Sequence, residues 1–203
     1  MDVESVELKT ADGTAIWCER TGSGDCWAVF VHDEGHDSDS WWPLRGPLLE
    51  EGLQQLSIDL RGHGASGDPW SEIDVCLDVA AAIDYARSEG ARRVYGIGAG
   101  LGATALIATG AEYPLDAIVC LSPRARIEGV GRAELRRTRG PKLIIVGAAY
   151  EQAMADAQTV YRDMIGWRLL ESRGIEANGT AQLTAEHGDH VIERTIQFLA
   201  EYA

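Results

Sequence analysis

Lysine is scarce in this sequence. Only Lys9 and Lys142 occur among 203 residues, and arginine supplies the other positive charges. Acidic residues outnumber basic ones by 32 to 18, which gives a formal net charge of −14. A charge of this sign and size repels phosphate backbones and anionic lipid surfaces. We therefore expect neither nucleic acid nor a membrane as a partner.

Long apolar runs are also absent. No stretch approaches the roughly 18 apolar residues that a membrane span requires. The acidic segment Met1–Glu4 is not followed by an apolar run of signal-peptide length, so we expect a cytoplasmic protein. The cysteines have neither metal-type nor redox-type spacing, and we expect them to be reduced, with no metal site and no cofactor. They are Cys18, Cys26, Cys76 and Cys120.

A side-chain oxygen is missing where a motif would require one. The apolar run Arg93–Ile97 is followed by Gly98-Ala99-Gly100-Leu101-Gly102 and then by a helix-like stretch. A strand, a tight glycine-rich turn and a helix are the setting of the nucleophile elbow Gly-x-Ser-x-Gly. Gly100 occupies the serine position. Glycine carries no oxygen or sulfur, so Gly100 cannot attack a carbonyl carbon.

Short apolar runs alternate with helical stretches along the chain, as expected for strands buried on both faces of a parallel sheet. This alternation predicts one α/β domain over residues 1–203. Its mostly parallel, twisted sheet would have about seven to eight strands, with helices on both faces. The apolar runs are Cys26–Val31, Leu53–Leu60, Arg93–Ile97, Ala117–Leu121 and Lys142–Val146; the helical stretches are Pro43–Glu51, Ile73–Ser88, Leu101–Glu112, Glu151–Asp163 and Val191–Tyr202.

Further motifs occur in an informative order. The strand Cys26–Val31 ends in His32, and a tryptophan pair precedes the next helix. The segment Asp59–Ser66 reads Asp-Leu-Arg-Gly-His-Gly-Ala-Ser, and a late His187-Gly188 precedes the last helix. Together with the glycine-rich turn, this order resembles the α/β-hydrolase superfamily, in particular its small esterase and dienelactone-hydrolase-like members. The short connection Ser122–Gly140 implies that no lid domain is inserted.

The resemblance implies a role for three positions. His187 matches the general base of the family. The triad acid is expected three residues after Gly147, where the chain has Tyr150. Glu151 could replace that acid only if the loop shifts by one residue, and an acidic residue in the first turn of a helix is the commoner role. The resemblance therefore implies that a second triad member is lost together with the nucleophile.

The same resemblance points to a substrate-binding region. The backbone N–H of Leu101 would form half of an oxyanion hole. Relatives place glycine after the histidine that ends the earlier strand, whereas this chain has Asp33 and Glu34. Carboxylates that point inward would oppose negative charge on a substrate oxygen. Trp41 and Tyr150 are further candidates for lining the pocket.

Three functions remain open from the sequence. The first is a repurposed or degenerate hydrolase that binds or converts a small molecule, with His187 as a general base. The second is a serine esterase or thioesterase whose nucleophile was replaced by Gly100. The third is a non-catalytic binding or interaction module that retains the fold. The acidic composition favours neutral or cationic ligands over anionic ones.

Overall fold

Eight strands form a single sheet in the computed structural model, which describes residues 3–202. The strands β1 and β2 pair antiparallel with each other, β2 pairs antiparallel with β4, and the remaining neighbours are parallel. The predicted α/β fold class is confirmed. In spatial order the strands are β1 (Val3–Lys9), β2 (Ala15–Thr21), β4 (Gln54–Ile58), β3 (Cys26–Val31), β5 (Arg93–Ala99), β6 (Ala117–Leu121), β7 (Lys142–Gly147) and β8 (Arg168–Arg173).

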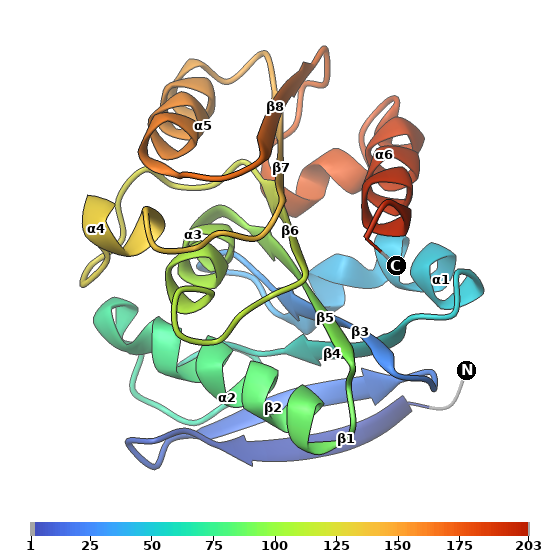
Figure 1. Cartoon of the computed structure of the whole chain (residues 1–203), viewed down its shortest axis with the longest axis vertical. Helices are drawn as coiled ribbons and strands as arrows, with labels where there is room; N and C mark the ends of the chain where they lie inside the picture. The colour runs from blue at the N-terminus through green and yellow to red at the C-terminus, as the bar shows by residue number, and fades with distance from the viewer. Residues whose placement is uncertain (1–2, 203) are drawn as a thin grey trace.

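Helices cover both faces of the sheet (Figure 1). The helices α2, α3 and α5 pack on one face, and α1 and α6 pack on the other, each layer enclosing its own apolar core. The central strands β3 to β7 are buried almost throughout, which explains the nearly continuous apolar sequences of β3, β5, β6 and β7. The strand β4 is equally buried but carries Gln54, Gln55 and Ser57. The helices are α1 (Trp42–Glu50), α2 (Val75–Ser88), α3 (Gly100–Thr109), α4 (Arg132–Leu135), α5 (Glu151–Asp163) and α6 (Gly188–Ala200), with 3₁₀ turns η1 (Ser38–Trp41), η2 (Glu72–Asp74) and η3 (Gly179–Leu183).

The sequence patterns missed one strand and misplaced some boundaries. The strand β8 lies at the edge of the sheet and is only partly buried, so its polar sequence has no continuous apolar run. The helix α6 starts at Gly188, three residues before its first buried apolar side chain, Val191. The helix α3 ends at Thr109 rather than at the expected Glu112.

The parallel strands bring several chain segments to one edge of the sheet, because their carboxyl ends point the same way. His32 follows β3, Gly100 follows β5, and Ser122 follows β6. This edge therefore holds the candidate site. Among residues 3–202, no helix combines the length and the apolar character needed to cross a bilayer.

Candidate functional site

The chain turns sharply at Gly100. The preceding residue, Ala99, is extended, with φ −121° and ψ 144°, whereas Gly100 has φ +51° and opens α3. A side chain at this φ is strained, which favours glycine. Two residues later, the helix approaches β3 so closely that a Cβ on Gly102 would lie 2.4 Å from the His32 carbonyl oxygen. Both glycines are therefore required by the local geometry.

The space beside Gly100 is filled by the carboxylate of Asp33. A Cβ on Gly100 would lie 2.0 Å from Cγ of Asp33 and about as close to both carboxylate oxygens, at 2.1 and 2.3 Å. No side chain can occupy that volume unless Asp33 moves. The loop after β3 thus delivers an acidic group to the place where the elbow motif carries its nucleophile.

One oxygen of Asp33 is held by two backbone N–H donors and one cationic side chain. The backbone N–H groups of Leu101 and Glu34 donate to Asp33 Oδ1 at 2.8 and 2.9 Å. Arg124 forms an ion pair with the same oxygen, with Nη2 and Oδ1 2.9 Å apart. Donation from the residue after the bend and from the loop after β3 is the pattern of an oxyanion hole. Here the hole holds an anion of the protein itself.

Arg124 is the counter-ion of this loop. Besides Asp33, it pairs with Glu34 through Nη1 and Oε2, 2.9 Å apart. Its backbone is also attached to the start of α3, because its N–H donates to the Gly100 carbonyl at 3.2 Å and its carbonyl accepts from the Thr104 hydroxyl at 2.6 Å. These contacts connect the segment after β6 to the elbow and to the loop after β3. We expected Asp33 and Glu34 to oppose negative charge on a substrate oxygen. Arg124 pairs with both carboxylates and therefore offsets part of their charge.

Two histidines hold the loop that carries Asp33. Buried His32 accepts a hydrogen bond from the Leu60 N–H at Nε2, and its Nδ1 lies 2.7 Å from the Asp33 carbonyl oxygen, so Nδ1 is the donor. Burial lowers the pKa of His32 to about 4, which keeps the ring neutral at pH 7. His63 accepts from the Gly35 N–H at 3.0 Å. These rings position the loop that carries the Asp33 carboxylate.

His187 lies away from this cluster. Its backbone is in the left-handed region, with φ +67°, and its side chain is 62% exposed. It lines a surface hollow of about 330 Å³ with Arg173 and His190, and its ring stacks against that of His190 with centroids 5.7 Å apart. Its ion-pair partner is the adjacent Glu186, with Nε2 and Oε1 3.8 Å apart. In residues 3–202, no hydrogen bond or ion pair joins His187 to a serine, a cysteine or an aspartate.

The remaining predicted site residues are scattered. Tyr150 and Glu151 are exposed at the start of α5, and neither makes a side-chain hydrogen bond or ion pair within residues 3–202. Trp41 is fully buried against Phe30, with ring centroids 5.3 Å apart, whereas its neighbour Trp42 is exposed. The structure therefore brings together Asp33, Glu34, Gly100 and Leu101, and it does not bring the late histidine or the β7 loop to them.

Sequence reasoning overlooked Arg124. The one available signal was its position three residues after the apolar run Ala117–Leu121, where the carboxyl end of a strand reaches the same edge as Gly100. No group of three or more His, Cys, Asp or Glu side chains within residues 3–202 is arranged to hold a metal ion.

This arrangement changes what the hole can do. A substrate carbonyl oxygen would have to displace Asp33 Oδ1 from its two backbone donors and from the Arg124 cation before it could bind there. Charge-assisted hydrogen bonds of this kind are stronger than neutral ones. These contacts fix the loop after β3 against the start of α3.

Known proteins resemble this chain in sequence and in fold. A model of the alpha/beta hydrolase family matches residues 28–195. The bifunctional esterase/perhydrolase DCH of Acinetobacter calcoaceticus is 34% identical over 115 residues, which are 55% of this chain and 41% of that protein. The matched region thus spans less than half of the curated relative.

Solved structures agree on the fold. The Pyrococcus furiosus esterase Pf2001 superposes with a TM-score of 0.85 at 17% identity, covering 99% of this chain and 91% of the esterase. The protein DcsB, solved in complex with its substrate analogue, superposes with a TM-score of 0.84 at 12% identity over 100% of both chains. With the family match covering most of its length, the chain belongs to the alpha/beta hydrolase family.

Proposed function

We propose that this chain is a repurposed hydrolase-fold protein that forms no acyl-enzyme intermediate and binds or converts a small molecule. The main support is that the Asp33 carboxylate fills the space that a side chain at position 100 would need. The same carboxylate also occupies both backbone donors of the hole. A serine hydrolase needs a nucleophile at the bend and an empty hole beside it. This chain has neither arrangement around Gly100.

The chemistry available to such a protein is non-covalent. His187 is our candidate general base, and it would act within the hollow that it lines with His190 and Arg173. Neither Tyr150 nor Glu151 contacts its ring, so no triad acid orients it. A neutral or cationic small molecule fits the overall charge of −14 better than an anionic one.

A hydrolysis and labelling experiment tests this proposal. The purified chain is incubated with short acyl esters, because its relatives are named esterases, and separately with a fluorophosphonate probe that reacts with activated serines. We expect no probe adduct by intact-protein mass spectrometry. We also expect no acyl-enzyme to be trapped when the chain is incubated with the esters. A probe adduct on the natural chain, or a trapped acyl-enzyme, would contradict the proposal.

The second candidate is a serine esterase or thioesterase in which Gly100 replaced the nucleophile. Its supporting observation is that the two hole donors, the N–H groups of Leu101 and Glu34, are both in place. Gly100→Ser alone is a poor test, because the new Cβ would collide with Asp33. The informative variant combines Gly100→Ser with Asp33→Gly, which removes the obstructing carboxylate.

The double variant separates the two candidates. Our proposal expects the folded double variant to remain unlabelled by fluorophosphonate, because no base contacts residue 100. Labelling and hydrolysis that appear in the double variant and vanish on adding His187→Ala would instead support the esterase origin. Circular dichroism and thermal unfolding of each variant confirm that it is folded before activity is compared.

A further inference from the structure

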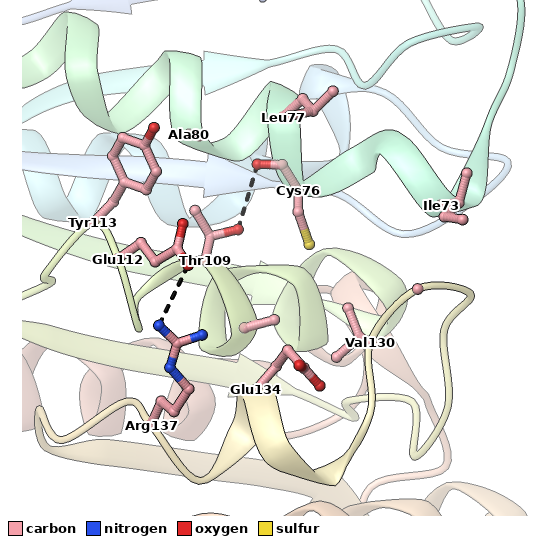
Figure 2. A pocket seen from close by; sticks show the side chains of 12 residues that line it. Ile73, Cys76, Leu77, Ala80, Thr109, Glu112, Tyr113, Val130, Glu134 and Arg137 are labelled. Atoms are coloured by element: carbon pink, nitrogen blue, oxygen red, sulfur yellow. Dashed lines mark hydrogen bonds and ion pairs between the residues drawn. The ribbon is translucent and has the colours of Figure 1, made fainter. Parts of the chain in front are cut away.

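A hollow of about 250 Å³ lies beside the carboxyl-terminal end of α3, between the helices α2 and α3 and the segment around α4 (Figure 2). None of its lining residues contributes to the cluster of Asp33, Arg124 and Leu101. Ligand sites commonly have volumes of roughly 300 to 1,000 Å³. This hollow therefore suits a small molecule of short chain length.

The walls of the hollow are mostly apolar. From α2 come the side chains of Leu77 and Ala80, and Val130 closes the opposite side (Figure 2). Ile73, which is 53% exposed, extends the apolar surface at one end. An exposed apolar surface of this kind gains free energy when a hydrocarbon group covers it.

Cys76 contributes an uncharged thiol to the lining of the hollow. Its thiol points from α2 toward the hollow (Figure 2). Burial raises the pKa of Cys76, and the carboxylates of Asp78 and Glu134 act in the same direction. The thiol therefore remains protonated at neutral pH and presents a soft, polarisable surface. The Thr109 hydroxyl does not add charge, since it donates to the Cys76 carbonyl oxygen at 3.5 Å.

The charges around the hollow are unbalanced. Glu112 and Arg137 neutralise each other through an exposed ion pair of 3.3 Å. Glu134 is half-buried and points toward the hollow from the α4 side (Figure 2). Its Oε2 accepts the Gly131 N–H at 2.9 Å, and no ion pair links Glu134 to a cationic side chain in residues 3–202. The hollow thus combines apolar walls with one carboxylate that lacks a counter-ion.

We propose that this hollow is a binding site for a small amphiphilic organic cation, namely a primary ammonium on a short alkyl chain. The alkyl chain lies against Leu77, Ala80 and Val130, and the ammonium pairs with Glu134. The net charge of the whole chain favours the approach of a cation to this carboxylate. A partly buried carboxylate binds an ammonium more strongly than an exposed one, because water screens the pair less.

Nuclear magnetic resonance of the full chain tests the site directly. The ¹⁵N-labelled protein is titrated with hexylammonium at about 0.15 M salt, the ionic strength at which exposed charges are strongly screened. We expect saturable shifts of the amide signals of Leu77, Ala80 and Val130. Hexanoate and hexanol provide the matched anionic and neutral probes. Equal saturation by either probe would overturn the proposal, because the carboxylate would then contribute nothing.

Two substitutions identify the groups responsible. Glu134→Gln should weaken hexylammonium binding by about tenfold, the effect of losing one charge-assisted contact. Glu176→Gln is the matched control, because it changes the net charge equally at an exposed residue outside the hollow. It should leave the affinity unchanged. Equal affinities of the Glu134→Gln and Glu176→Gln variants would refute the site, as would undiminished binding after Ala80→Phe fills the hollow.

Discussion

Residue 100 and Asp33 exclude each other sterically: a Cβ at position 100 would lie 2.0 Å from Cγ of Asp33. Non-bonded heavy atoms in proteins do not approach so closely, so one of the two groups would have to move. The glycine at the bend and the acidic residue after His32 therefore form one structural unit. The consequence is that a side chain at position 100 and the observed position of the Asp33 carboxylate are incompatible.

A double-mutant cycle should measure this dependence. Gly100→Ala combines an unfavourable φ of +51° with the collision, and we expect it to lower the free energy of unfolding by about 2 to 4 kcal/mol. In an Asp33→Ala background the collision disappears, and the cost should fall to the backbone strain of about 1 to 2 kcal/mol. Urea unfolding of the natural chain, both single variants and the double variant gives the coupling energy. Strictly additive effects would contradict the proposed steric unit.

Removing the counter-ion of Asp33 should destabilise the fold. Arg124→Gln leaves the partly buried Asp33 and the exposed Glu34 without their shared cation, and we expect a loss of about 1 to 2 kcal/mol. The matched control is Arg92→Gln, since Arg92 is 82% exposed and pairs with an exposed Asp25. That change should stay within about 0.5 kcal/mol. Equal losses in the two variants, measured by denaturant unfolding, would show that the Arg124 pairs contribute no more than surface pairs do.

His32 should make the protein sensitive to mild acid. Its pKa falls from 6.5 to about 4 because the ring is buried, so between these values the unfolded chain binds a proton that the folded chain does not. Stability from this residue is present above pH 6.5 and declines as the pH falls toward 4, by about 3 kcal/mol in all.

The comparison with His32→Gln isolates this titration. Glutamine retains an acceptor for the Leu60 N–H but carries no titratable group. We expect the unfolding free energy of the natural chain to fall more steeply than that of the variant over this pH range. Parallel curves for the two proteins would exclude His32 as the cause.

Lys142 should add a second increase of stability with pH, on the alkaline side. Its ammonium is buried and donates to the carbonyl oxygens of Thr138, Gly140 and Ile165. Burial lowers its pKa from 10.5 to about 8. Between these values the unfolded chain binds more protons, so the contribution of Lys142 to stability rises with pH. Thermal unfolding of the natural chain and of Lys142→Met should diverge from pH 8 to 10.5, in favour of the natural chain. A constant difference would refute this assignment.

The central sheet was predictable because its strands are buried on both faces. The runs Cys26–Val31 and Ala117–Leu121 are apolar throughout, and their strands have the expected bounds. The strand β8 was not predictable in this way. It lies at the edge of the sheet and exposes polar side chains, so its sequence contains no continuous apolar run.

The site was predictable only in its parts. The bend at Gly100 and the acidic pair Asp33 and Glu34 were each evident from local motifs. Their contact depends on the packing of two loops that are distant in sequence, and a local pattern cannot specify that packing. The late His187 illustrates the same limit, because a His-Gly pair indicates a position along the chain but not the direction of an exposed ring.

The oxygen that occupies the hole is covalently attached to the chain. A tethered group competes at an effective concentration in the millimolar range or above, and dilution or dialysis does not reduce it. Free carboxylates such as acetate would have to exceed that concentration to enter beside Leu101. Buffer anions should therefore leave this part of the molecule unchanged, and only exchange of the Asp33 side chain would vacate it.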